Sequence, residues 1–246
     1  MALVVVITGG LNGLGRYLTK RFSEEGHIVN VIDIANIERN NSQGFDYYCA
    51  NIADRNAIGA VFSDIYSKKR RIDVLVNNAA KRYFSFLENA SPEDIVDTIE
   101  VNLTANYITT REALKYMKKT GFGRIINISS HSSFQDYPKG SLYCATKAGL
   151  NIFTRVAAKE IDKNLDITIN ALCPSKIYSI EAEKEQNTDK GLILPETIFK
   201  VISKLIRSNL NGAVIPIISF RIFLITFFCQ IKNSLNWWKH CIWRHL

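Results

Sequence analysis

Short apolar runs, rich in Val and Ile, alternate along the chain with longer stretches in which apolar residues recur at helical spacing. Apolar runs of this kind are typical of strands buried on both faces of a parallel sheet. The pattern predicts seven strands, at 3–7, 27–34, 45–50, 72–76, 124–128, 167–173 and 213–217. The stretches between them predict helices at 15–26, 54–71, 92–119, 141–163 and 195–208. This regular alternation predicts an α/β fold, a Rossmann-like, doubly wound parallel sheet in three layers.

Capping residues set the beginnings of two of these helices. Asp54 precedes the second helix, and Ser91 and Pro92 open the third, with acidic residues following them. Asn102 lies in the middle of the third helix, where Asn is a mediocre helix former. Its position predicts a local irregularity and a functional role for Asn102.

Length and composition predict one domain. At 246 residues, of which 47% are hydrophobic, the chain can bury the core of a single α/β domain, which we expect at 1–217, followed by a hydrophobic and basic tail at 218–246. No signal-peptide pattern precedes Leu3, and the five cysteines include no Cys-x-x-Cys pair. We therefore expect a cytoplasmic protein with neither a disulfide framework nor a metal site.

The formal net charge of +8 does not indicate a nucleic-acid-binding surface, because of where the charge lies. Residues 1–196 hold 24 basic and 23 acidic residues, whereas the rest of the chain holds seven basic residues and no acid. The excess belongs to the C-terminal part of the chain. A basic groove across the fold is therefore not expected.

A glycine-rich turn follows the first predicted strand and opens the first helix. It reads Thr8-Gly9-Gly10-Leu11-Asn12-Gly13-Leu14-Gly15. Glycines in this position let the backbone turn tightly and approach a pyrophosphate, which then lies at the helix N-terminus. The alternative is an ordinary turn between a strand and a helix. The order of strand, glycines and helix favours dinucleotide binding.

Asp33 lies near the end of the second predicted strand, eighteen residues after Gly15. A carboxylate there can accept hydrogen bonds from both ribose hydroxyls of NAD and would repel the 2′-phosphate of NADP. We therefore expect NAD as the cofactor, with NADP the weaker ligand. The alternative is a strand-end Asp that caps a turn.

The stretch 124–147 contains the residues that indicate catalysis. Tyr143 and Lys147 are four residues apart on a predicted helix, so their side chains share one face. An ammonium about 5 Å from a phenol, at an effective dielectric of about 20, favours the phenolate by roughly 3 kcal/mol, which lowers the phenol pKa by about two units. By itself such a pair is usually solvated. Ser130, at the end of the preceding strand, is placed to bind the oxygen that Tyr143 would protonate, and this favours a proton-transfer site.

With these residues in place, the chain resembles the short-chain dehydrogenase/reductase family over 1–217. The family's glycine pattern, Thr-Gly-x-x-x-Gly-x-Gly, is matched by Thr8, Gly9, Gly13 and Gly15. Its Asn-Asn-Ala-Gly motif appears as Asn77-Asn78-Ala79-Ala80, and the thirteen residues from Ser130 to Tyr143 agree with its usual separation. The resemblance implies NAD(H)-dependent interconversion of a secondary alcohol and a ketone on a small molecule.

The resemblance also implies roles for individual residues. Tyr143 would be the general acid/base, and Ser130 would hydrogen-bond the substrate oxygen. Lys147 would lower the phenol pKa and bind the nicotinamide ribose, and Asn102 would hold a water that relays the proton. Cofactor contacts would come from Thr8, Gly9, Asn12, Gly13, Leu14, Gly15, Asp33, Asn51, Ile52, Asn78, Ala79, Ala80, Tyr143, Lys147, Pro174, Ile177 and Ser179.

The chain departs from the family at Ala80 and Ser175, which stand where the family has glycines near the cofactor, and in its tail. Two other functions stay open. One is a nucleotide-binding sensor or scaffold without turnover, although the complete Asn, Ser, Tyr and Lys set argues against it. The other is an NAD-dependent sugar-nucleotide epimerase or dehydratase, whose glycine spacing and C-terminal lobe usually differ.

Two expectations concern assembly and the tail. Relatives in the family commonly pair through two long helices, here about 93–119 and 141–163, so we expect a homodimer or homotetramer. The tail contains all three tryptophans, four basic residues and no acid. It either packs on the core or in an interface, or makes a peripheral membrane contact through aromatic and basic side chains. Its apolar stretch is too short for a transmembrane span.

Overall fold

The computed structural model describes residues 1–36, 44–177 and 192–218. Within them the chain forms one sheet of seven strands in the order β3-β2-β1-β4-β5-β6-β7, in which every neighbouring pair is parallel. The strands are β1 (Val4–Thr8), β2 (Ile28–Asp33), β3 (Asp46–Cys49), β4 (Val74–Asn77), β5 (Phe122–Ile128), β6 (Asp166–Pro174) and β7 (Val214–Ile217). The strand order reverses between β1 and β4, and such a reversal leaves a crevice at the carboxyl ends of the strands.

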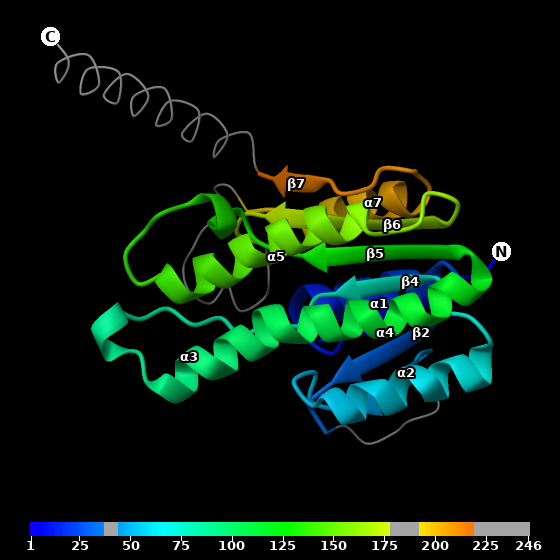
Figure 1. Cartoon of the computed structure of the whole chain (residues 1–246), viewed down its shortest axis with the longest axis horizontal. Helices are drawn as coiled ribbons and strands as arrows, with labels where there is room; N and C mark the ends of the chain where they lie inside the picture. Colours follow the sequence, from blue (N-terminus) through cyan, green and yellow to red (C-terminus); the bar gives the residue numbers. More distant parts are fainter. Residues whose placement is uncertain (37–43, 178–191, 219–246) are drawn as a thin grey trace, which may run out of the picture.

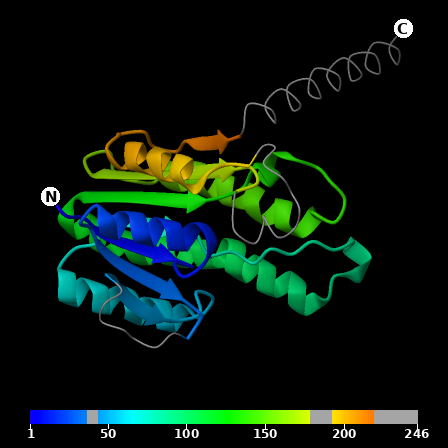
Figure 2. The same cartoon turned by 180° about the vertical axis from the view of Figure 1, so that it is seen from behind.

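Helices cover both faces of this sheet. They are α1 (Gly13–Glu24), α2 (Arg55–Lys69), α3 (Pro92–Ile99), α4 (Ala105–Thr120), α5 (Ser141–Lys159) and α7 (Pro195–Ile206). Figure 1 shows α2, α4 and α5 in front of the sheet, and Figure 2 shows α1 and α7 on the opposite face. The predicted three-layer, doubly wound parallel fold is therefore confirmed.

Each face of the sheet has its own hydrophobic core, because successive strand side chains point to opposite sides. In β1, Val4 and Val6 belong to the core under α2, α4 and α5, whereas Val5 and Ile7 belong to the core under α1 and α7. All four are at most 1% exposed. Burial on both faces explains why the strands read as continuous apolar runs rather than as alternating patterns.

The long helix predicted at 92–119 contains the irregularity expected at Asn102. The Ser91 side chain caps the start of α3 by accepting from the Asp94 N–H at 3.0 Å. Glu100–Thr104 then forms a π-helical turn before α4 begins, and Asn102 lies fully buried in it. Single π turns inside helices are frequent at functional sites.

One predicted boundary is wrong. Helix α5 ends at Lys159 rather than near residue 163. The Asp162 side chain accepts from the Asn164 N–H at 2.9 Å, and the Leu165 N–H donates to the Asp162 carbonyl at 3.0 Å. A local turn of this type competes with the helix for backbone groups and leads directly into β6.

A buried polar network ties the central strands to the helices in front of them. Asn77 and Asn127 face each other across β4 and β5, and Asn77 Nδ2 donates to Asn127 Oδ1 at 2.9 Å. The Thr109 hydroxyl on α4 donates to Asn77 Oδ1 at 2.7 Å, and Asn127 Nδ2 donates to Thr154 Oγ1 on α5 at 2.9 Å. The relative positions of these four elements are thereby fixed.

The expectations about assembly and the tail stay predictions. Helices α4 and α5 expose Tyr107, Ile152 and Val156, as a helix-pairing face would. Residues 219–246 lie outside the described part of the chain. Within 1–36, 44–177 and 192–218, none of the helices has the length and apolar character needed to cross a membrane.

Candidate active site

The predicted site residues of the described chain gather around the carboxyl ends of the strands. The turn at Thr8 follows β1, Asn78 follows β4 and Ser130 lies two residues after β5. In Figure 1 the arrowheads of β4 and β5 point towards the same side, where α3 and the segment that leads into α5 also lie. The reversal of strand order between β1 and β4 falls within this edge.

The turn after β1 passes so close to the segment after β4 that side chains are excluded. A Cβ added at Gly15 would lie 1.9 Å from the Gly9 carbonyl oxygen, and one added at Gly9 would lie 2.9 Å from the Ala79 Cα. Gly9 and Gly13 also have positive φ angles, +65° and +49°, which residues with a Cβ rarely adopt. Contacts made by the fold therefore exclude a side chain at Gly9 and Gly15, and the backbone angles disfavour one at Gly9 and Gly13.

Thr8 and Asn78 hold the two segments together. The Thr8 hydroxyl accepts from the backbone N–H groups of Asn78 at 3.0 Å and Ala79 at 3.1 Å. Asn78 Nδ2 donates to the carbonyl oxygens of Thr8 at 3.1 Å and Gly9 at 2.9 Å. Both side chains thus shape the crevice. Their predicted roles in direct cofactor contact stay predictions.

The start of α1 fits the pyrophosphate of a dinucleotide. Asn12 is the N-cap residue but makes no side-chain capping hydrogen bond, and the first turn, which includes Leu14, contains no acidic residue. Backbone N–H groups at an uncapped helix start need an acceptor, and the helix dipole favours an anion there. Ser175, directly after β6, has a buried hydroxyl oxygen without a hydrogen-bond partner among the described residues.

Asp33 is buried at the end of β2 and already contacts the glycine-rich turn. Its Oδ2 accepts from the Leu11 N–H at 3.0 Å and its Oδ1 from the Ala35 N–H at 3.1 Å. This is the turn-capping role considered above as the alternative. Each carboxylate oxygen has two acceptor sites, so the same group retains capacity for ribose hydroxyls. The capping role and the cofactor role are therefore compatible.

The remaining predicted cofactor residues follow the other strands. Asn51 is exposed after β3 and its Oδ1 accepts from the Ala53 N–H at 3.0 Å, whereas Ile52 is buried in the front core. Ala80 is exposed after β4, so its methyl group has room. Pro174 ends β6, and Ile177 forms an isolated bridge with Ile193. Ser179 lies outside the described residues.

Tyr143 and Ser130, the predicted acid/base and its hydrogen-bonding partner, lie close together. Tyr143 lies on the first turn of α5 and is 9% exposed. Burial raises the pKa of the Tyr143 phenol, while hydrogen bonding with Ser130 and the charge of Arg82 oppose that shift. Burial thus outweighs the groups that favour the phenolate, and the predicted role of Lys147 in lowering the Tyr143 pKa stays a prediction.

The position of the Lys147 ammonium explains this result. Lys147 is 2% exposed, its Nζ donates to the Ile128 carbonyl oxygen at 2.9 Å, and it lies 5.8 Å from the Tyr143 ring centroid. Burial lowers the pKa of Lys147 from 10.5 to about 8, and the charge of the nearby Cys173 opposes that shift. The ammonium is thus bound to backbone and desolvated rather than directed at the phenol.

The Asn102 side chain acts as a clamp in this structure. Its Oδ1 accepts from the Lys81 N–H at 2.8 Å, and its Nδ2 donates to the Lys81 carbonyl at 2.9 Å and to Thr146 Oγ1 at 3.3 Å. It therefore joins the segment after β4 to α5. Its predicted role in holding a water stays a prediction, for which the π turn and the location beside α5 are favourable.

Two neighbours of Tyr143 come from the segment after β4. The Phe84 ring centroid lies 5.1 Å from that of Tyr143, and the Arg82 guanidinium carbon lies 5.8 Å from the Phe84 centroid. No sequence signal places Arg82 there, because about sixty residues separate it from Tyr143.

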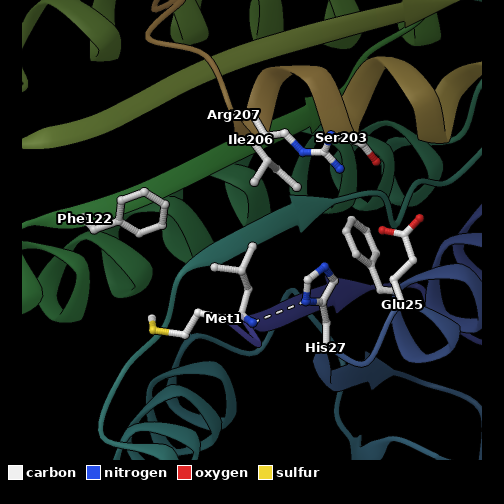
Figure 3. A pocket seen from close by; sticks show the side chains of 9 residues that line it. Met1, Glu25, His27, Phe122, Ser203, Ile206 and Arg207 are labelled. Atoms are coloured by element: carbon white, nitrogen blue, oxygen red, sulfur yellow. Dashed lines mark hydrogen bonds between the residues drawn. The ribbon is translucent and has the colours of Figure 1, made fainter.

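A cavity of about 290 Å³ lies at the opposite end of the sheet (Figure 3). Its lining includes Phe22, His27, Phe122, Ser203 and Arg207, and the His27 Nδ1 accepts from the Leu3 N–H at 3.2 Å. None of the predicted site residues lines it. This cavity is therefore separate from the crevice at the carboxyl ends of the strands.

Comparison with known proteins gives consistent matches over most of the chain. A family model described as short chain dehydrogenase matches residues 3–191. The 3-oxoacyl-acyl-carrier-protein reductase FabG of Thermotoga maritima is 34% identical over 189 residues, which cover 74% of this chain and 76% of that protein.

Two solved structures show the same fold with bound cofactor. ElxO with NADP bound is 26% identical, with a TM-score of 0.78 over 88% of this chain and 97% of that one. The 4-hydroxyisoleucine dehydrogenase complexed with NADH is 26% identical, with a TM-score of 0.77 over 87% of this chain and 96% of that one. Proteins with either cofactor are thus similar to this chain.

Replacing Gly15 with Ala should disrupt the crevice, because the new methyl group would collide with the Gly9 carbonyl oxygen. We expect the free energy of unfolding to fall by about 1–3 kcal/mol and the Kd for NADH to rise at least about tenfold. Urea unfolding and NADH fluorescence titration measure the two effects.

The matched control is Gly59→Ala in α2, where no atom outside the helix backbone lies within 4 Å of the added Cβ. It should stabilise the protein by about 0.5–1 kcal/mol without affecting NADH binding, and equal behaviour of the two variants would contradict the steric argument.

The lowered pKa of Lys147 predicts how stability changes with pH. Between about pH 8 and pH 10.5 the unfolded chain retains the Lys147 proton that the folded chain has lost, so stability rises with pH in this window. The free energy of unfolding of the natural chain should gain about 3 kcal/mol relative to Lys147→Met across it. Urea unfolding over pH 7–11 measures this difference. The exposed Lys118→Met control should parallel the natural chain, and a parallel Lys147→Met curve would disprove the shift.

Proposed function

Because the chain belongs to the short-chain dehydrogenase family, we propose that it is an NAD(H)-dependent oxidoreductase that interconverts a secondary alcohol and a ketone. The resemblance seen in the sequence is confirmed by the family match. The family supports an oxidoreductase that acts on a CH–OH or C=O group of a small molecule with an NAD(P) cofactor. To this the proposal adds the preference for NAD and the roles of individual residues.

The observation that supports the proposal is that Ser130 and Lys147 lie close to Tyr143, at the same edge of the sheet as the glycine-rich turn. A nicotinamide cofactor held there would supply or accept the hydride. In the direction of reduction, the Tyr143 hydroxyl donates its proton to the substrate oxygen, and the Ser130 hydroxyl donates a hydrogen bond to the same oxygen. Both groups stand on structurally constrained positions, at the first turn of α5 and just after β5.

The burial of Tyr143 favours the reductive direction at neutral pH. Burial raises the pKa of Tyr143, so the phenol keeps the proton that reduction requires. Oxidation of an alcohol requires the phenolate, which nearby positive charge and hydrogen bonds to its oxygen can stabilise in a buried site. Arg82 provides such a charge at Tyr143, and the Lys147 ammonium lies 5.8 Å from the Tyr143 ring centroid.

The proposed preference for NAD rests on Asp33. Its carboxylate lies at the end of β2, close to the turn that would receive the pyrophosphate, since it binds the Leu11 N–H of that turn. A 2′-phosphate brought to this position would meet a buried negative charge. Similar structures are described with NADP and with NADH, so the preference follows from Asp33 and not from the comparisons.

Substitution of Tyr143 by Phe tests the catalytic role. The variant loses only the hydroxyl group, so we expect kcat to fall about a thousandfold while the Kd for NADH stays within about twofold. Stopped assays of NADH oxidation with a panel of ketones, and fluorescence titration of NADH, measure the two quantities. A variant that retained most of the activity would refute the assignment.

The same assay on the natural chain separates the competing functions. Stoichiometric release of NAD with alcohol product supports an oxidoreductase. An epimerase or dehydratase would return its cofactor unchanged, and a sensor or scaffold would bind NADH without consuming it.

Cofactor preference is tested by titrating both reduced cofactors. We expect the natural chain to bind NADH at least about tenfold more tightly than NADPH, because Asp33 would repel the 2′-phosphate. Asp33→Asn removes the charge but retains an acceptor oxygen, so the difference between the two Kd values should shrink. Tighter binding of NADPH by the natural chain would overturn the preference.

A further inference from the structure

Two segments distant in sequence meet over Tyr143. The Ser85 N–H, in the segment after β4, donates to the Lys139 carbonyl oxygen, in the segment before α5, at 3.0 Å. Figure 1 shows both segments on the side towards which β4 and β5 point. The Phe84 ring lies near two phenols, with centroid distances of 5.1 Å to Tyr143 and 6.2 Å to Tyr137. Phe84 and Tyr137 are partly exposed, so they form an open aromatic wall beside the reacting phenol.

Arg82 places an available positive charge on this wall. Its guanidinium carbon lies 5.8 Å from the Phe84 ring centroid, so a single ring separates it from Tyr143. The adjacent Lys81 forms ion pairs with Asp94 and Asp97 at 3.2 and 3.3 Å. By contrast, none of the carboxylates in the described part of the chain pairs with Arg82, whose side chain is exposed.

The charge of Arg82 also acts on the site itself. Burial raises the pKa of both Tyr143 and Tyr137, and Arg82 opposes this shift in both. Arg82 is therefore close enough to influence the proton that Tyr143 exchanges. A guanidinium presents a planar set of donors that matches a carboxylate or a phosphate, and its weak hydration favours pairing at a partly buried rim.

Building on the proposed function, we propose that Arg82, Phe84 and Tyr137 form a subsite that selects ketones bearing an anionic group a few bonds from the reacting carbonyl. Arg82 pairs with the carboxylate or phosphate of the substrate. The rings of Phe84 and Tyr137 contact the carbon chain between that anion and the carbonyl, which lies at Tyr143. The substrates of this class are oxo acids, and the corresponding hydroxy acids in the reverse direction.

Arg82 lies too close to Tyr143 for this subsite to bind the phosphates of a carrier such as coenzyme A while the carbonyl reacts. In a coenzyme A thioester the phosphates lie a pantetheine arm away from the reacting carbonyl. With one ring between Arg82 and Tyr143, those phosphates would lie beyond the subsite when the carbonyl is at Tyr143. Acetoacetyl-coenzyme A therefore serves as a negative probe.

The test compares each charged ketone with its neutral ester. The probes are acetoacetate against ethyl acetoacetate, and 2-oxopropylphosphonate against its dimethyl ester, all with NADH. In Arg82→Gln we expect the acid-to-ester ratio of kcat/KM to fall at least about tenfold for the preferred anion, mainly through KM. Any effect of Arg82 on Tyr143 that both substrates share cancels in this ratio. In Arg82→Lys the acid-to-ester ratio should lie between those of the natural chain and Arg82→Gln. Lys118→Gln, which removes the same charge at an exposed position of α4, should leave the ratio unchanged.

The outcomes decide whether the subsite exists and which anion it binds. A loss confined to acetoacetate identifies a carboxylate, and a loss confined to the phosphonate identifies a phosphate. An unchanged ratio in Arg82→Gln, a natural chain that reduces only the esters, or a loss seen only with acetoacetyl-coenzyme A overturns the subsite while leaving the proposed function intact.

If the natural chain reduces none of the ketones, the proposed function fails, and binding decides the subsite separately. Acetoacetate and the phosphonate are then titrated into the enzyme–NADH complex by fluorescence. Weaker binding in Arg82→Gln than in Lys118→Gln supports the subsite, and equal binding overturns it.

Discussion

The candidate active site depends on one buried polar contact between neighbouring strands, the pair formed by Asn77 and Asn127. Asn77 Nδ2 donates to Asn127 Oδ1 at 2.9 Å, and the two amides are completed by hydroxyls of α4 and α5. In a dry interior each such group would cost about 1–3 kcal/mol if left unpaired, so only one register satisfies all of them. The π turn of Asn102 leads into α4, Tyr143 lies on α5, and Ser130 follows β5. The same contact therefore positions three of the proposed catalytic residues.

The second constraint is the close approach of the turn after β1 to the segment after β4. Gly9, Gly15 and Ala79 leave no space for additional side-chain atoms, and Thr8 and Asn78 join the two segments by hydrogen bonds. The crevice is thus narrow, lined by backbone and placed at the reversal of strand order. At position 80, where the family has a glycine, this chain has room for the methyl group of Ala80, because that residue is exposed.

Electrostatics in the site are governed by desolvation more than by paired charges. Burial raises the pKa of Tyr143 and lowers that of Lys147 to about 8, so both groups are shifted towards their neutral forms. This state retains a transferable proton on the phenol. The exposed charge of Arg82, one ring away, then gives the site a means of recognising an anion that does not depend on burying another charge.

The sequence by itself determined the features that depend on neighbouring residues. Apolar runs located all seven strands, Asp54 and Ser91 marked helix starts that the structure confirms, and the glycine spacing located the crevice. Tertiary structure alone decided that Lys147 binds the Ile128 carbonyl and that burial governs Tyr143. It also brought Arg82 and Phe84 to α5. Solvation and contacts between distant segments are properties of the packed chain, and spacing along the sequence encodes neither.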